Sequence, residues 1–208
     1  MAREEFTKME QLGIIRPPSL PWASPLHMAP KASGGWRPCG DYRLLNQITT
    51  SDRYPVPHIQ SFNERLANTC IYSKLDLIRS YHQIPVHPDS IPKTAVTTPF
   101  RLWEFVRTPF GLKNAGQTFQ RLMDSMFRDL DYVFVYMDDI LVASESVAAH
   151  EQHLQQVFTI LSQNGMVLNK SKCELGVDNI NFLAHHVSNT GIRPTPERVS
   201  AIKEYPQP

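Results

Sequence analysis

Cysteine is scarce in this sequence of 208 residues. The three cysteines, Cys39, Cys70 and Cys173, lie far apart and form no CxxC pair. Closely spaced cysteine pairs are what a disulfide framework or a zinc module requires, so the spacing argues against both. We expect reduced thiols, as in an intracellular protein.

Long apolar runs and a marked excess of charge of one sign are also missing. The chain starts with MAREEFTKMEQLG, which is charged rather than signal-like, and no apolar stretch approaches the roughly 20 residues that span a bilayer. The formal net charge is +1, which by itself demands no nucleic-acid partner. We therefore expect a cytoplasmic protein that has no membrane partner and is not exported.

A hydrophobic content of 41% is enough for one domain, or for one composite domain of two lobes. Neither a Walker lysine motif nor GxGxxG occurs, which excludes nucleotide binding by those loops. Apolar spacing predicts helices and one clear strand, in the order helix 3–12, helix 57–70, strand 71–77, helix 114–130 and helix 148–165. Hairpin-like strands covered by helices favour an α+β fold, with helices on one face of the sheet, over a doubly wound parallel fold.

Two of the predicted helices carry signals at their ends. Asn114 and Gln117 stand where an N-cap residue and an N3 residue would stand in the helix that follows. Gly165 follows the last helix as a C′ residue.

Two adjacent carboxylates, Asp138 and Asp139, interrupt the apolar run VFVYMDDILVAS. The simplest interpretation is a tight turn between two strands, because Asp is a good turn residue. The usual Asn-Gly or Asp-Gly is missing, however, and two carboxylates between apolar strands resist desolvation unless a cation compensates them. Magnesium takes oxygen ligands and keeps positions open for phosphates, so these carboxylates and Asp76, at another strand end, form a candidate magnesium site.

Three ordered blocks, YSKLDLIRSYHQI, PFGLKNAGQTFQR and YMDDILVAS, resemble the successive motifs of reverse transcriptases. The chain is similar to the reverse transcriptase domain of gypsy-type LTR retrotransposon Pol polyproteins. Further blocks extend the resemblance over nearly the whole chain, namely GIIRPPSLPWASPLHMAPK, GGWRPCGDYRLLN, DRYPVPHI, IPKTA and FLAHHVSNTGIRPTPERVSAI. YMDD alone is weak evidence, whereas an ordered series of blocks is specific.

The resemblance implies a right-hand polymerase fold with an antiparallel palm sheet backed by helices. The implied fingers cover residues 1–51 and 84–114, and the palm covers 52–83 and 115–190. The palm holds the YMDD hairpin and a segment like the primer grip, while 191–208 would begin the thumb or connection. With most of the thumb missing, we expect weak retention of template-primer, because distributed phosphate contacts supply much of the affinity for nucleic acid.

The resemblance also assigns the chemistry. Asp76, Asp138 and Asp139 would be both the catalytic residues and the ligands of two Mg²⁺ ions, with Mn²⁺ as a substitute. Two such ions can stabilise the attacking and the leaving oxygen of an in-line phosphoryl displacement.

The positions that would bind the incoming dNTP are Lys31, Arg37, Tyr81, Phe110, Gly111 and Gln120. Arg37 and Lys31 would grip the triphosphate, although KASGG departs from the family's more highly charged run and both could be ordinary surface cations. Tyr81 corresponds to a steric gate against the ribose 2′-hydroxyl, and a role in the core is the alternative. Phe110 and Gly111 would form the pocket floor. Gln120, on the helix after that floor, could instead be a polar residue beside the core face.

The primer terminus would lie beside Tyr136 and Met137, which could equally be hairpin core. A second segment, Phe182, Leu183 and Ala184 in NFLAHHV, resembles the primer grip. The family's usual glycine is replaced there by Ala184, which is unfavourable if the backbone requires a positive φ.

The function implied by the resemblance is an RNA- and DNA-directed DNA polymerase that adds dNTPs to a primer 3′-hydroxyl during retrotransposon replication. Its partners would be an RNA or DNA template with primer, dNTPs, and the rest of a Pol polyprotein with RNase H and integrase, inside virus-like particles. A catalytically inactive nucleic-acid-binding remnant or truncated fragment is one alternative, and a magnesium-dependent nuclease is another. His150 and His153 suit a polar helix face better than a zinc site.

Overall fold

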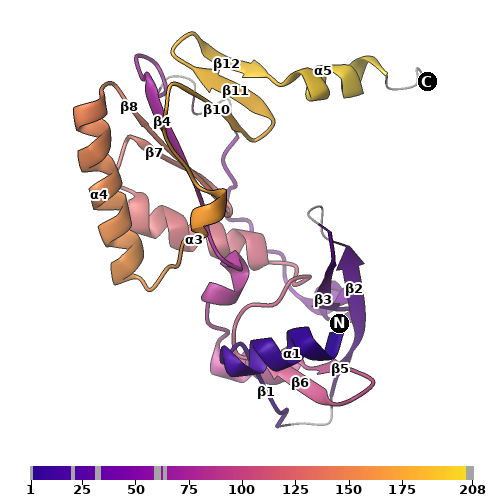
Figure 1. Ribbon diagram of the computed structural model, residues 1–208. Helices are drawn as coiled ribbons and strands as arrows, with labels where there is room; N and C mark the ends of the chain where they lie inside the picture. The colour runs from indigo at the N-terminus through magenta and orange to yellow at the C-terminus, as the bar shows by residue number, and fades with distance from the viewer. Residues whose placement is uncertain (1, 20–21, 31–33, 59–61, 63–64, 205–208) are drawn as a thin grey trace. The chain divides into compact units, whose positions relative to one another are not determined.

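The computed structural model describes residues 2–19, 22–30, 34–58, 62 and 65–204 (Figure 1). The chain divides into two compact, interleaved units. The first unit comprises Met1–Tyr54 and Arg79–Phe119, and the second comprises Pro55–Ile78 and Gln120–Pro208. The boundaries after Tyr54, Ile78 and Phe119 fall three to five residues from those that the resemblance implies between fingers and palm, whereas residues 191–208 belong to the second unit rather than to a separate part.

The first unit is built on a five-stranded mixed sheet with the order β1-β6-β5-β2-β3. The strands are β1 (Ile15–Arg16), β2 (Ser24–Pro30), β3 (Trp36–Gly40), β5 (Val96–Thr97) and β6 (Leu102–Phe105). The helical segments are α1 (Ala2–Gln11), α2 (Arg43–Ile48), η2 (Ser80–Gln83) and η3 (Pro88–Thr94). Helix α1 is amphipathic, and its buried Phe6 and Met9 join Val96, Trp103 and Phe105 in the core of this unit.

A glycine at the end of β3 allows one aromatic side chain to complete this core. Tyr42 is buried, and its hydroxyl donates a hydrogen bond to the Thr94 carbonyl at 2.7 Å. A Cβ at Gly40 would overlap the Tyr42 ring, and a Cβ at Gly111 would lie 3.2 Å from the Gly40 carbonyl oxygen. The backbones around Gly40 and Gly111 therefore approach closely.

The second unit is built on a four-stranded antiparallel sheet with the order β7-β8-β4-β9. The strands are β4 (Ile71–Asp76), β7 (Val133–Tyr136), β8 (Asp139–Ser144) and β9 (Glu174–Val177). Helix α4 (Val147–Gln163) and the part of α3 (Ala115–Phe127) that belongs to this unit pack beside it (Figure 1). A short helical turn, η4 (Lys170–Lys172), precedes β9.

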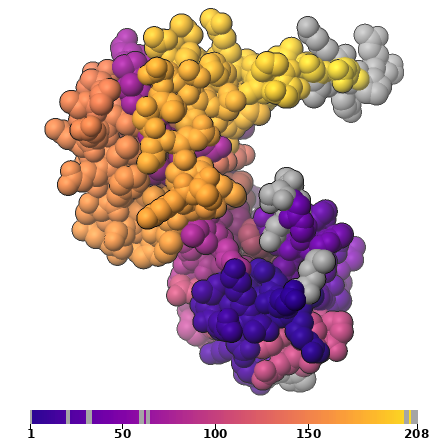
Figure 2. Space-filling view, viewed as in Figure 1, coloured from indigo at the N-terminus to yellow at the C-terminus, as the bar shows by residue number. Residues whose placement is uncertain are grey.

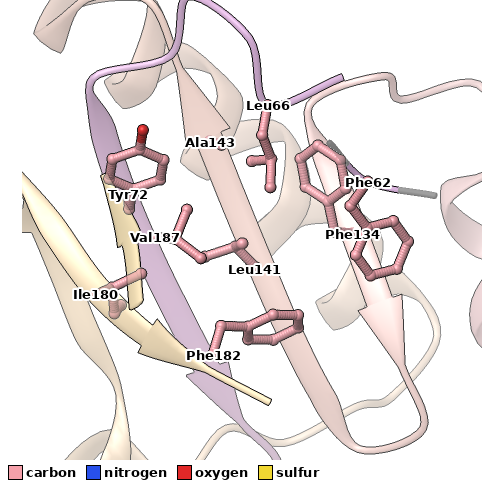
Figure 3. Packing of buried hydrophobic residues seen from close by; sticks show 9 residues of the cluster. All are labelled: Phe62, Leu66, Tyr72, Phe134, Leu141, Ala143, Ile180, Phe182 and Val187. Atoms are coloured by element: carbon pink, nitrogen blue, oxygen red, sulfur yellow. The ribbon is translucent and has the colours of Figure 1, made fainter. Parts of the chain in front are cut away.

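The opposite face of this sheet is covered by a smaller three-stranded sheet. Its strands are β10 (Asn179–Phe182), β11 (His185–Ser188) and β12 (Gly191–Pro194). Tyr72 and Ala143 are cross-strand partners, as are Phe134 and Leu141, so period-two alternation places them on shared faces. Figure 3 shows these side chains packed against Ile180, Phe182 and Val187, which close the core.

The last helix, α5 (Pro196–Lys203), extends beyond the three-stranded sheet from which the chain leads into it (Figures 1 and 2). The assignment of residues 191–208 to the start of a thumb stays a prediction. None of the helices in the described part of the chain is both long and apolar enough to cross a membrane.

Of the residues predicted to end or cap helices, Gly165 has the predicted role, whereas the side chain of Asn114 bonds to another segment. Gly165 has φ +68° and follows α4 as a C′ residue, as predicted, and the Ser146 hydroxyl caps the start of that helix. Asn114 stands at the N-cap position of α3, where its carbonyl accepts from Thr118 N. Its side-chain amide, however, bonds to the backbone of residues 50 and 52 rather than to its own helix.

The helix predicted over residues 57–70 does not reach either end of that range, since residues 57–58 and 69–70 are not helical. Phe62 lies in a 3-10 turn, and its carbonyl accepts a hydrogen bond from Leu66 N at 2.9 Å. Residues 59–61 and 63–64 lie outside the described residues. Residues 65–68 form a turn there. The Arg65 guanidinium donates hydrogen bonds to the carbonyls of Leu130, Asp131 and Val133. These contacts fix Arg65 to the end of α3 and the edge of β7.

Candidate active site

Two of the three predicted carboxylates meet at one end of the second unit's sheet. Asp76 ends β4, Asp139 begins β8, and the two residues are cross-strand partners. Tyr136 pairs with Asp139, so Met137 and Asp138 form a two-residue loop between β7 and β8. Hairpin loops of this length favour a positive φ at the first loop position, and Met137 has φ +52° without being glycine. The hairpin thus projects Asp138 beside the paired carboxylates.

Lysines accompany both paired carboxylates. Lys74 Nζ lies 3.6 Å from Asp139 Oδ1, and Lys172 Nζ lies 3.6 Å from Asp76 Oδ2. Burial raises the pKa of the Asp139 carboxyl above its usual range. The charges of Asp138 and Asp76 act in the same direction, whereas Lys74 opposes them. The sequence alone did not point to either lysine.

The chemistry of these donors fits a hard divalent cation, because all three are carboxylates and two of them face each other across paired strands. Within the described ranges, no three Asp, Glu, His or Cys side chains gather around one point as a finished metal site. Two ammonium groups lie against the carboxylates instead. A cation bound at Asp139 Oδ1 or at Asp76 Oδ2 would therefore compete with the lysine at that oxygen.

Gln120 lies under the hairpin rather than on an open surface. Its side chain is fully buried. Its Nε2 donates to the Val135 carbonyl at 3.2 Å and to Asp124 Oδ1 at 2.8 Å, and its Oε1 accepts from Met137 N at 2.7 Å. The amide is thus bonded to the backbone on both sides of Tyr136. These contacts favour the core-side alternative for Gln120 over a direct contact with the dNTP.

In the first unit, three of the residues expected at the dNTP lie together. The Arg37 guanidinium stacks over the Phe110 ring at 4.2 Å from its centroid. Phe110 meets the Tyr81 ring edge to face at a centroid distance of 5.3 Å. Gly111 has φ +96°, which explains the glycine there. Lys31 lies outside the described residues.

A histidine that sequence reasoning missed completes this aromatic group. The His82 ring lies 5.3 Å from Phe110, centroid to centroid. Burial lowers the pKa of His82 to about 4, and the positive charges of Arg79 and Arg37 act in the same direction. His82 is therefore neutral at physiological pH and adds no charge beside Arg37.

The segment that resembles the primer grip is a tight hairpin. Phe182 pairs with His185, which leaves Leu183 and Ala184 as a two-residue loop with φ +50° and +57°. Such loops favour Asn-Gly, so Ala184 carries the strain that the missing glycine would relieve. Phe182 is fully buried, and Tyr136 packs against the same core cluster. The structure therefore gives both aromatic residues contacts in the core.

The histidines of HEQH belong to a hydrogen-bond network at the far end of β4 and β8. Both ring nitrogens of His150 lie 2.7 Å from hydroxyls, Nε2 from Ser73 and Nδ1 from Ser144. His153 Nδ1 lies 2.8 Å from the same Ser144 hydroxyl, and its ring stacks on Tyr132 at 3.5 Å. His150 thus has no nitrogen left for a metal. It is buried, however, so the prediction of a polar helix face is wrong for His150.

Comparison with known proteins gives the family that the sequence motifs resemble. Residues 29–187 match the family described as reverse transcriptase (RNA-dependent DNA polymerase). The chain is 40% identical to the retrovirus-related Pol polyprotein from transposon 297 of Drosophila melanogaster, over 98% of this chain and 20% of that protein. The corresponding polyprotein from transposon gypsy of the same organism is 34% identical over the same shares. The chain thus spans about a fifth of the length of these relatives.

Solved structures show the same likeness. A foamy viral protease-reverse transcriptase in complex with double-stranded DNA superposes with a TM-score of 0.90 at 25% identity, covering all of this chain and 37% of that one. A second such complex with double-stranded DNA gives a TM-score of 0.88, also at 25% identity and over all of this chain, and covers 44% of that chain.

Proposed function

This chain belongs to the reverse transcriptase family, and we propose that it forms the fingers and palm of an RNA-directed DNA polymerase that also copies DNA. The resemblance to gypsy-type retrotransposons is confirmed by relatives that are transposon Pol polyproteins. The α+β polymerase fold is likewise confirmed by the likeness to viral reverse transcriptases.

The proposed substrates are a primed RNA or DNA template and dNTPs. Support comes from the foamy viral relatives, which were solved with double-stranded DNA and with an RNA/DNA hybrid. The transposon Pol polyproteins, in contrast, are about five times as long as this chain. We therefore propose that it works as one part of a Pol polyprotein, beside RNase H and integrase.

Asp76, Asp138 and Asp139 are the residues we propose as ligands of two Mg²⁺ ions. When bound, such ions would stabilise the charge that develops on the attacking and leaving oxygens of an in-line displacement at phosphorus. The protein's own contribution is to fix the positions of the carboxylates. The pairing of β4 with β8 fixes Asp76 against Asp139, and Gln120 fixes the backbone of the loop that carries Asp138.

The first unit would supply the residues that recognise the nucleotide. The Arg37 guanidinium offers a planar fork for phosphate oxygens, and its stacking on Phe110 limits its motion. The Tyr81 ring contacts the rings of both Phe110 and Phe119, at centroid distances of 5.3 and 5.4 Å. A ring held in this way is a firm barrier to a ribose 2′-hydroxyl, which supports the gate role proposed for Tyr81.

The observation that carries the proposal is the cross-strand pairing of Asp76 with Asp139. The test is extension of a labelled oligo(dT) primer on poly(rA) with dTTP and Mg²⁺, with and without EDTA. We expect growth that needs metal and is lost in the Asp138→Asn, Asp139→Asn double variant. A folded wild-type preparation that binds template-primer without extending it would contradict the proposal and support the inactive-remnant alternative.

A further inference from the structure

Lys74 stands between two carboxylates on the sheet of the second unit. It lies on β4, which has β8 on one side and β9 on the other. Towards β8, its ammonium contacts Asp139 Oδ1 at 3.6 Å. Towards β9, its cross-strand partner is Glu174, beside a register shift in the pairing between Tyr72 and Lys74. Opposed residues of antiparallel strands lie close enough for their side chains to interact. A second acceptor is therefore within reach of the same lysine.

The side chains of Lys172 and Lys74 differ in how easily each can move away from its carboxylate. Lys172 lies on the short turn η4, and its side chain is 61% exposed, so its ammonium can withdraw into solvent. The Lys74 side chain is only 26% exposed and starts from an inner strand of the sheet. Its ammonium therefore has less freedom to move into solvent than that of Lys172.

A divalent cation at Asp139 changes what this lysine experiences. The cation takes over the carboxylate oxygens and repels the ammonium, because like charges at contact distance destabilise each other. Glu174, the cross-strand partner of Lys74 on β9, then offers a compensating charge on the same sheet. The direction of the Lys74 side chain should therefore depend on whether metal is present.

We propose that Lys74 is a metal-responsive counter-ion, which pairs with Asp139 when the site is free of metal and moves to Glu174 when a divalent cation binds. This inference rests on the proposed function, since it requires Asp139 to be a metal ligand. Lys74 then acts as a positioning residue, because it offsets the repulsion among the carboxylates until a cation arrives. Glu174 sets how easily the lysine is released.

The two residues are expected to shift metal affinity in opposite directions. Lys74→Met removes a competing cation, so divalent cations should bind more tightly. Glu174→Gln removes the second acceptor, so they should bind more weakly. Each change should be about two- to fivefold in Kd, the range that a partly exposed ion pair gives. In a Lys74→Met background, Glu174→Gln should have no further effect.

The test is a titration of the full chain with Mn²⁺ alone, without nucleic acid, in which electron paramagnetic resonance measures free Mn²⁺. The Asp138→Asn, Asp139→Asn variant defines the binding that depends on the carboxylates. Matched controls are Lys170→Met and Glu151→Gln, which remove exposed charges of the same kind. Lys74→Gln repeats the lysine test with a polar side chain, and thermal melting shows that each variant is folded.

The outcomes separate the inference from the proposed function. Tighter binding in Lys74→Met, weaker binding in Glu174→Gln and the absence of a Glu174 effect without the lysine support the exchange. Carboxylate-dependent binding that both variants leave at the level of their controls overturns the exchange but leaves the metal site standing. An effect of Glu174→Gln that persists without Lys74 also overturns it. Mn²⁺ binding that ignores Asp138 and Asp139 removes both the metal site and the inference.

Discussion

Asp76 and Asp139 lie directly opposite each other where β4 and β8 meet, at the end of a sheet whose middle is apolar. Two carboxylates in this position repel each other and lose part of their hydration, so they depend on cations. In this structure the cations are two lysine side chains. A catalytic divalent cation would supply the same compensating positive charge.

Replacing Asp139 by asparagine should stabilise the metal-free protein at neutral pH. Burial raises the pKa of Asp139, and Asp138 and Asp76 add to this while Lys74 opposes it. With a raised pKa in the folded state, the favourable contribution is present below the pKa of an unfolded aspartate and is lost as pH rises through the folded pKa. Because the side chain is partly exposed, the gain from Asp139→Asn should be at most about 1 kcal/mol.

The measurement is urea denaturation of wild type and Asp139→Asn in EDTA, at pH 7 and at about pH 3, just below the ordinary aspartate pKa. The free energy of unfolding should favour the variant more at pH 7. A gain that is equal or larger at low pH would show that ionisation of Asp139 costs no stability.

Gln120→Ala should lower kcat for primer extension and leave KM for dTTP nearly unchanged. The change leaves Met137 N without its acceptor and Val135 O without its donor, which costs about 1–3 kcal/mol for each buried group that stays unsatisfied. Steady-state extension kinetics distinguish the two roles, with Gln163→Ala on the exposed side of α4 as the control. A raised KM with unchanged kcat would instead restore Gln120 to direct contact with the nucleotide.

Ala184→Gly should stabilise the second unit. Ala184 has φ +57° in a two-residue loop, and this left-handed conformation costs a non-glycine residue about 1–2 kcal/mol. The added backbone freedom of glycine in the unfolded chain offsets about half of this, so a net gain of about 0.5–1 kcal/mol is expected. Urea denaturation measures it, and Ala148→Gly in α4 should have the opposite sign. Equal destabilisation by both changes would refute the strain at Ala184.

Tyr81→Val should relax discrimination against ribonucleotides. Phe110 and Phe119 hold the Tyr81 ring in place, and valine would leave that space open. The ratio of kcat/KM for dTTP to that for UTP should fall about tenfold or more, as expected when a steric clash is removed. Tyr132→Val, which alters an aromatic residue elsewhere on the chain, is the control. An unchanged ratio would remove Tyr81 from the gate.

The parts of the account that the sequence could predict are those that local patterns determine. Asp138 and Asp139 interrupt an apolar run, and such a break requires a turn or a cation whatever the rest of the fold. Gly165 ends α4 as predicted, because a positive φ after a helix is a local demand. The strand that ends at Asp76 and the helices α3 and α4 follow from apolar spacing.

The parts that the sequence could not predict depend on how distant segments are aligned. Lys74 was visible as a neighbour of Asp76, but its contact with Asp139 follows from the register of β4 against β8. Gln120 acquired its role only because α3 passes under the hairpin. Asn114 was predicted to cap its own helix, but its side chain forms hydrogen bonds with the backbone of residues 50 and 52 instead.

Incorporation of a single nucleotide by Asp76→Asn, under single-turnover conditions, tests most directly whether the paired carboxylates are the catalytic centre. Fluorescence anisotropy with labelled template-primer measures binding in parallel, and Asp89→Asn, which alters a side chain that is 88% exposed, is the control. We predict template-primer binding close to wild type and a rate of incorporation lower by about a hundredfold or more, as when a group that stabilises the transition state is removed. A variant that binds template-primer and incorporates the nucleotide at the rate of Asp89→Asn would contradict the account.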